Sequence, residues 1–222
     1  MATSLQPGAL DLLRELEKNN DKAWYDAHRA ELKARLIEPI AAILERASTR
    51  LARGAIPLAG GAKTMFRMNR DTRFSANKLP YKINVGGVLT ADGSKRNTDG
   101  LAYLHCEPGA SFVAAGFYRP ETAWLEPVRQ RMVDDAAGWR RVLRTLGKAD
   151  LALSTEGALS GMPRGFAREK AHEHADSLRL TSLVVTRALD DGTWYDDDGA
   201  LDALVAIARD ARPLIAFGRG AH

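Results

Sequence analysis

Residues 101–118 read LAYLHCEPGASFVAAGFY, and this stretch decides the fold class. It holds two candidate strands, residues 101–107 and 111–118. Pro108 and Gly109 lie between them, and this pair is typical of a tight turn. Short strands that are joined by a tight turn pair in the antiparallel direction, so the stretch predicts a β-hairpin.

Further strands are expected on both sides of this hairpin. The candidates are residues 64–69, 83–90 and 181–187. Because successive side chains of a strand point to opposite faces, Arg67 and Asn69 are expected on one face of the first candidate.

Helical periodicity flanks the strands. Asp21 is the expected N-cap of a long second helix, and a kink or a break is expected at Pro39. Trp194 falls in an expected loop and is the candidate for an exposed tryptophan. We therefore expect a single α+β domain with a mainly antiparallel sheet of about four to five strands packed against helices. Its expected parts, within residues 1–222, are N-terminal helices (9–53), a strand-rich core (64–118), central helices (121–147) and a C-terminal strand and helix (181–217).

Length and composition favour a cytoplasmic protein. The chain has 222 residues, 45% of them hydrophobic, and its one cysteine, Cys106, excludes a disulfide scaffold. Residues 1–7 do not resemble a Sec-type signal peptide. No apolar run approaches the roughly 20 residues that span a bilayer, so no membrane partner is expected. The oligomeric state is left open.

The segment from Lys63 to Lys82 concentrates the positive charge of the chain. It contains six lysines and arginines and a single acid, Asp71, so its local charge is +5. Since the whole chain carries +4, the remainder carries −1. A general nucleic-acid binder usually spreads its charge over a whole face. The pattern therefore favours a localised anion site.

Arginine offers a planar fork of donors that suits phosphate or carboxylate, and lysine adds a compact charge. The sequence thus predicts a site for a small anionic, phosphate-bearing ligand. The alternative is structural, with Asp71, Glu107 or Glu121 pairing with the arginines. The predicted ligand-binding residues are Arg67, Asn69, Arg70, Arg73, Lys78, Tyr81, Lys82, Tyr118 and Arg119.

Two residues are candidates for catalytic proton transfer. His105 is the first, because histidine changes charge near neutral pH, and it shares a strand face with Tyr103. A hydrogen-bonded structural histidine is the alternative. Asp71 is the second, although flanking arginines would keep it ionised and make it a poor base. Alternatively, Asp71 has a structural role and orients the side chains of Arg70 and Arg73. The sequence leaves open whether any ligand is turned over.

No metal site and no cofactor are expected. On a helix His172 and Asp176 would share a face while His174 would point elsewhere, and on a strand the two histidines would align instead. No second cluster has ligand spacing. Residues 190–199 do not fit an EF-hand loop. No Walker A, Gly-x-Gly-x-x-Gly or Gly-x-Ser-x-Gly motif occurs, which argues against P-loop NTPases, Rossmann dehydrogenases and typical α/β-hydrolases.

The basic run also resembles the signature of a known family, domain of unknown function 2461. The resemblance rests on residues 66–75 (FRMNRDTRFS) and 78–82 (KLPYK). Supporting matches are Asn19-Asn20 with Trp24-Tyr25, Tyr103–His105, Gly116–Pro120 and Met162–Phe166. The family often has lysine where this chain has Ala76 and Thr181, so those two cations are not expected to be essential. The resemblance implies a conserved hypothetical protein, with no substrate or cofactor to carry over.

Two other functions are alternatives to the binding of a small anion. Nucleic acid could bind the same run, with Phe74, Tyr81 and Tyr118 stacking on bases. Alternatively, the chain is a non-catalytic interaction domain whose arginines pair internally.

Overall fold

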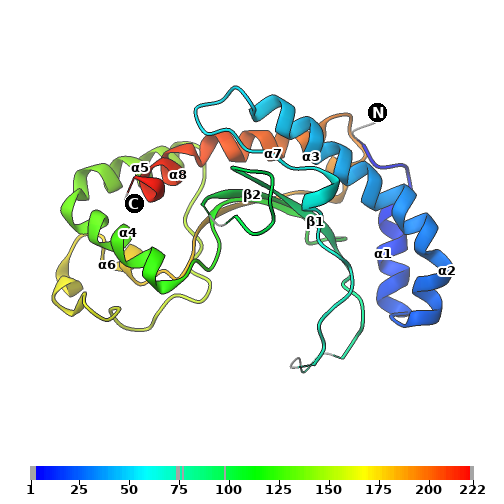
Figure 1. The fold of residues 1–222 in the computed structure, drawn as a ribbon, viewed down its shortest axis with the longest axis horizontal. Helices are drawn as coiled ribbons and strands as arrows, with labels where there is room; N and C mark the ends of the chain where they lie inside the picture. The colour runs from blue at the N-terminus through cyan, green and yellow to red at the C-terminus, as the bar shows by residue number, and fades with distance from the viewer. Residues whose placement is uncertain (1–3, 74–75, 77, 98, 221–222) are drawn as a thin grey trace.

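The structure is a computed structural model that describes residues 4–73, 76, 78–97 and 99–220. Within these residues the chain forms a four-stranded antiparallel sheet with helices packed on it, so the predicted α+β class is confirmed (Figure 1). No helix in the described ranges is long and apolar enough to cross a membrane.

The strands follow one another in sequence order across the sheet. The predicted hairpin forms β2 (Leu101–Cys106) and β3 (Phe112–Phe117), which lie between β1 (Val85–Thr90) and β4 (Leu183–Ala188). All three pairs of neighbours are antiparallel. Four of the predicted strands are therefore confirmed, with ends that differ by one or two residues.

Two long helices cover one face of this sheet. They are α3 (Glu38–Leu51) and α7 (Gly199–Asp210), which run side by side above the strands in Figure 1. Alternate β2 residues, Ala102, Leu104 and Cys106, are fully buried beneath them, because a strand sends every second side chain to the same face. The opposite face of the sheet is the floor of the site described below.

The remaining helices lie at the two ends of the molecule (Figure 1). They are α1 (Ala9–Lys18) and α2 (Lys22–Leu32) at one end, and α4 (Thr122–Asp134), α5 (Ala136–Lys148), α6 (Ala175–Leu178) and α8 (Arg212–Arg219) at the other. Asp21 caps α2 by accepting from the backbone N–H of Trp24 at 2.9 Å, as predicted. A π-helical turn, Lys33–Ile37, joins α2 to α3 just before Pro39, whose missing N–H removes one helical hydrogen bond.

Two local predictions are wrong. Residues 64–69 do not form a regular strand: a 3₁₀ turn (Ala62–Thr64) leads into an extended segment joined to its neighbours by two isolated bridges, Met65 to Gly87 and Asn69 to Tyr81. Trp194 is 1% exposed rather than on the surface. Its indole N–H donates to Ser111 Oγ at 2.9 Å, which satisfies the polar end of the ring inside the core.

Candidate functional site

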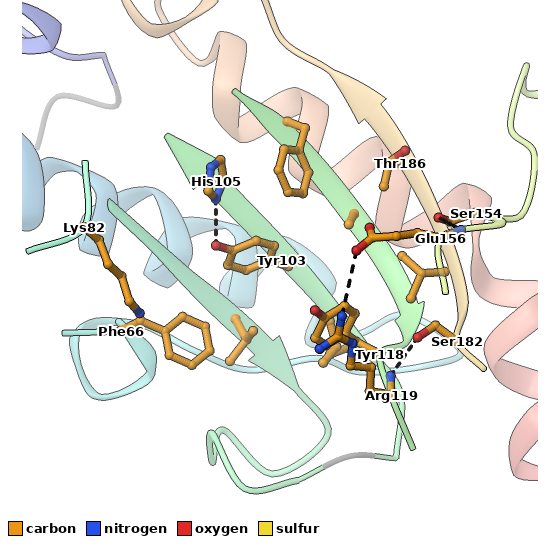
Figure 2. A pocket seen from close by; sticks show the side chains of 15 residues that line it. Phe66, Lys82, Tyr103, His105, Tyr118, Arg119, Ser154, Glu156, Ser182 and Thr186 are labelled. Atoms are coloured by element: carbon orange, nitrogen blue, oxygen red, sulfur yellow. Dashed lines mark hydrogen bonds and ion pairs between the residues drawn. The ribbon is translucent and has the colours of Figure 1, made fainter. Parts of the chain in front are cut away.

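The open face of the sheet carries a cavity of about 460 Å³ (Figure 2). All four strands contribute side chains to its lining, among them Val88, Leu101, Tyr103, His105, Phe112, Ala114 and Val184. Lys82 and Phe66 close one side, and Tyr118, Arg119 and Glu156 close the other. The cavity is therefore mainly apolar and aromatic at its floor, with a cation on each side.

A chain of hydrogen bonds runs along β2 at the floor. The Tyr103 hydroxyl lies 2.8 Å from His105 Nδ1, and His105 Nε2 lies 2.7 Å from Glu107 Oε2. Because an ionised carboxylate can only accept, Nε2 carries the proton that Glu107 accepts. When the ring carries only this proton, Nδ1 is an acceptor and the Tyr103 hydroxyl donates to it. The three side chains share one face because they are two residues apart on an extended chain.

Residues of both neighbouring strands, β1 and β3, pack against Tyr103 and His105 and fix their positions. Phe112, directly opposite His105 on β3, stacks on the imidazole with the ring centroids 4.5 Å apart. Gly86 lies opposite His105 on β1, and a Cβ there would come within 2.9 Å of the Tyr103 hydroxyl. The absence of a side chain at Gly86 thus leaves room for the Tyr103 ring.

The turn after His105 also holds Glu107 in place. Ser111 Oγ donates to the Glu107 carbonyl at 2.7 Å and accepts from the Glu107 N–H at 3.0 Å. The same oxygen accepts from the buried Trp194. The backbone that carries the carboxylate is therefore tied to the core.

The basic run forms an extended arm beside β1, which we call the basic arm (residues 65–82, with 74, 75 and 77 outside the described residues). It projects below the sheet in Figure 1. Its base is clamped by Asn20, whose side chain accepts from the Tyr81 N–H at 3.0 Å and donates to the Tyr81 carbonyl at 3.1 Å. Tyr25 stacks on the Tyr81 ring with the centroids 3.8 Å apart. The arm is therefore anchored to the N-terminal helices.

Lys82 is the cation of this arm that reaches the cavity (Figure 2). Its Nζ lies 5.9 Å from the centroid of the Phe66 ring. Burial lowers the pKa of Lys82, and the charges of Arg67 and Arg70 lower it further. No ion pair joins these three cations to a carboxylate within the described part of the chain. Of these three predicted ligand-binding cations, Lys82 lines the cavity, while Arg67 and Arg70 act on its charge without lining the cavity.

The other predicted residues of the arm lie apart from the cavity. Arg73 makes a two-pronged contact with Asp71, at 2.9 and 2.7 Å, and this guanidinium holds the pKa of the Asp71 carboxyl below its usual range. Lys78 donates to the Thr72 carbonyl at 3.0 Å. Asn69 is exposed, and Tyr81 is buried against Tyr25. The predicted pairing of Asp71 therefore involves Arg73, while Glu107 contacts His105 instead of an arginine.

Tyr118 and Arg119 stand at the far side of the cavity from Lys82 (Figure 2). Tyr118 is 56% exposed, and the Arg119 guanidinium lies over its ring at 5.2 Å. Arg119 has a φ of 45°, in the left-handed region that non-glycine residues rarely adopt. Its backbone N–H donates to Ser182 Oγ at 2.9 Å, which holds this conformation at the end of β3.

No group of three or more His, Cys, Asp or Glu side chains that could hold a metal occurs in the ranges that the structure describes. The histidines considered from the sequence have other partners. His174 is buried and donates from Nε2 to the Ala136 carbonyl at 2.8 Å, while His172 Nδ1 accepts from the His174 N–H.

Comparison with known proteins gives a family for nearly the whole chain. The profile described as "Conserved hypothetical protein (DUF2461)" matches residues 8–217. The chain belongs to this family. No curated protein and no solved structure matches the chain. Membership of DUF2461 confirms the resemblance seen in the sequence and assigns no activity.

The fold explains why distant stretches carry the likeness to DUF2461. Asn20 and Tyr25 contact Tyr81, which belongs to the KLPYK part of the signature. Tyr103 and His105 lie at the cavity floor, and the stretch Gly116–Pro120 carries Tyr118 and Arg119 to its far side. These three stretches therefore either line the cavity or anchor the arm beside it, whereas Met162–Phe166 does not line the cavity.

Sequence reasoning missed several side chains of the site. Glu107 was considered only as a partner for arginines, although its spacing of two from His105 places it on the same strand face. Phe66 and Phe112 were not predicted as site residues because their side chains carry no polar or charged group. Gly86 belongs to a Gly-Gly pair inside an apolar strand, which is a signal for close approach of another group.

The anchor of the basic arm leads to a prediction. Asn20→Ala removes both hydrogen bonds to the Tyr81 backbone, and we expect the free energy of unfolding to fall by about 1 to 2 kcal/mol. Urea denaturation followed by tryptophan fluorescence measures this change. Asn19→Ala is the matched control, because the Asn19 side chain donates to the Glu15 carbonyl of α1 and makes no bond to Tyr81. An equal loss in both variants would contradict the anchoring role of Asn20.

Proposed function

We propose that the cavity binds a small organic anion with an aromatic or acyl body and one carboxylate or phosphate group. The observation that carries this proposal is Lys82, a half-buried cation at the cavity wall with two arginines close by. The positive charges of Arg67 and Arg70 disfavour the charged form of Lys82, and within the described residues no carboxylate forms an ion pair with any of the three. A bound anion would relieve this repulsion.

The rest of the cavity supports a ligand with an apolar body. Its volume of about 460 Å³ lies within the usual range for small-molecule sites. Tyr103 and Phe112 offer aromatic surface at the floor, and Phe66 offers more beside Lys82. Apolar contacts would hold the body of the ligand, and the cation would orient it.

The far side of the cavity offers a second polar contact. Arg119 is paired only loosely there, with its guanidinium 3.8 Å from the Glu156 carboxylate, and both side chains are largely exposed. Ser182 and Thr186 line the same side. A second polar group on the ligand would reach these residues.

Titration calorimetry with benzoate and phenyl phosphate tests the proposal, with benzyl alcohol as a neutral probe. We expect the two anions to bind more tightly than the alcohol. Lys82→Met keeps most of the side-chain volume and removes the charge, and we expect it to weaken anion binding about tenfold or more. Lys63→Met is the matched control, because Lys63 is exposed and belongs to the same run but does not line the cavity. Equal affinity for anions and alcohol would contradict the proposal.

The other two functions inferred from the sequence have weaker support. Tyr81 is buried against Tyr25, so it is not free to stack on a base, and Phe74 lies outside the described residues. The Arg73–Asp71 contact is an internal pairing, as an interaction domain would require, but Arg67 and Arg70 form no ion pair in the described ranges. A cytoplasmic location stays a prediction from the sequence.

A further inference from the structure

The chain of hydrogen bonds on β2 ends at the cavity. Tyr103 and His105 both line it, and the Tyr103 ring lies between Lys82 and Arg119 in Figure 2. The Tyr103 proton is engaged by His105 Nδ1 at 2.8 Å, so the lone pairs of the hydroxyl oxygen stay available to a bound molecule. Glu107 stands behind His105 and does not line the cavity.

We propose that this cavity is a catalytic centre in which the Tyr103 hydroxyl accepts a proton from the bound anion while it passes its own proton to His105, with Glu107 as the positioning residue. The proposal rests on the proposed function, since it supplies the substrate class. That class is an organic carboxylate or phosphate that also carries a hydroxyl group or a C–H bond next to a carbonyl.

Each proton that leaves one atom in this step joins another atom of the site. The O–H or C–H bond of the substrate breaks, and its proton joins the Tyr103 oxygen. The original Tyr103 O–H bond breaks, and that proton joins His105 Nδ1. The imidazolium that forms keeps its Nε2 proton, which Glu107 accepts at 2.7 Å, so the new positive charge faces a carboxylate. The reverse sequence returns a proton to the substrate.

The surroundings of Tyr103 favour this route over direct ionisation. Burial raises the pKa of Tyr103 to about 12, and the charge of Glu107 adds to the shift. The phenol therefore keeps its proton near neutral pH and can lose it only to a base within reach, as a serine hydroxyl does beside histidine. Phe66 separates Tyr103 from Lys82, with its ring centroid 6.0 Å from that of Tyr103. Lys82 lines the same cavity as Tyr103, so its positive charge would favour negative charge on a substrate bound there.

A covalent probe tests the proton transfer before a substrate is known. We choose 4-(fluorosulfonyl)benzoate, which has an aromatic body and a carboxylate. When the Tyr103 oxygen attacks sulfur, an S–O bond forms, the S–F bond breaks, fluoride leaves and the Tyr103 proton passes to His105. Peptide mapping by mass spectrometry identifies the modified residue. We expect Tyr103 to react faster than Tyr118, although Tyr118 is the more exposed of the two cavity tyrosines.

Two variants separate proton transfer from a structural hydrogen bond. His105→Gln removes the base, and we expect labelling of Tyr103 to slow about a hundredfold. Glu107→Gln preserves the shape of the side chain and removes its charge, and we expect a slowing of about tenfold. Labelling of Tyr118 is the internal control and should not change. If His105→Gln fails to fold by circular dichroism, Glu107→Gln carries the test alone.

The outcomes distinguish this proposal from the proposed function. Labelling of Lys82 or Tyr118 ahead of Tyr103, or unchanged rates at Tyr103 in the folded variants, would overturn the proton transfer. Saturation of the rate with probe concentration and protection by benzoate report binding. If Tyr103 reacts as expected without saturation or protection, the anion site is wrong while the proton transfer stands. If the rate saturates but another residue is labelled, the anion site stands and the proton transfer is wrong.

Discussion

Arg129→Ala is expected to lower the free energy of unfolding by about 3 to 6 kcal/mol, because it removes two hydrogen bonds from a charged donor. Arg129 lies on α4 and is 4% exposed. Its Nε donates to the Leu178 carbonyl at 2.8 Å and its Nη2 to the Leu180 carbonyl at 2.9 Å. In the variant both carbonyls would lose these partners, and the missing side chain would leave a void.

Urea denaturation measures the loss, and two further variants define its cause. Arg129→Lys keeps a positive charge but cannot span both carbonyls, so we expect an intermediate loss of stability. Arg144→Ala is the control on the neighbouring helix α5, where the side chain is exposed, and it should change stability by less than about 0.5 kcal/mol. A loss below about 1 kcal/mol for Arg129→Ala would contradict the structural role given to the buried guanidinium.

This buried arginine also supports one side of the cavity. Leu178 ends α6, and Leu180 is followed closely by Ser182, which lines the cavity and accepts from the Arg119 N–H. Arg129 thus fixes the segment that leads into β4. Loss of its hydrogen bonds should disturb Ser182 before it disturbs Tyr103, which lies on β2 in the middle of the sheet.

The elements of the fold that depend on the pattern of neighbouring residues could be predicted from the sequence. The hairpin of β2 and β3 follows from two short strands and the Pro108-Gly109 turn, and the structure confirms it. Residues 64–69, where the basic arm begins, were predicted as a strand because their side chains alternate between two faces. The actual conformation of the arm depends on Asn20, 61 positions before Tyr81, and no local pattern encodes that contact.

The burial of Trp194 has the same explanation. The surrounding aspartates and glycine are typical of a surface turn, so the local sequence favours exposure. The indole is buried because Ser111, 83 positions earlier, accepts its N–H. A contact between such distant residues follows from the register of the sheet and the path of the chain, and neither can be derived from residues 190–199 alone.

The site was predictable to a similar degree. Strand alternation places Tyr103 and His105 on one face, and the structure has both at the cavity. The position of Lys82 near Tyr103 depends on the path of the arm. The Tyr103 ring has room because Gly86 of β1 pairs with His105 of β2. This pairing cannot be predicted from the sequence of β2 alone.

Gly86→Ala is expected to lower the free energy of unfolding by about 3 kcal/mol and to break the Tyr103–His105 hydrogen bond. A Cβ at this position would lie 2.6 Å from the Leu104 carbonyl oxygen and 2.9 Å from the Tyr103 hydroxyl. The carbonyl belongs to the neighbouring strand and cannot move without disturbing the ladder, so the strain falls on β1 and on the Tyr103 ring. Urea denaturation measures the first effect, and the imidazole nitrogen shifts of His105 report the second.

Gly161→Ala is the matched control for this substitution. A Cβ at Gly161 would meet nothing within 4 Å, and the residue lies in an exposed loop, so stability should change by less than about 0.5 kcal/mol. If Gly86→Ala were as stable as the wild type and left the His105 shifts unchanged, the close packing of β1 against Tyr103 would be wrong. If the free energy of unfolding fell but the His105 shifts stayed unchanged, the clash would be relieved at the backbone alone. Gly86 would then be needed for the pairing of β1 with β2 and not for the position of the Tyr103 hydroxyl.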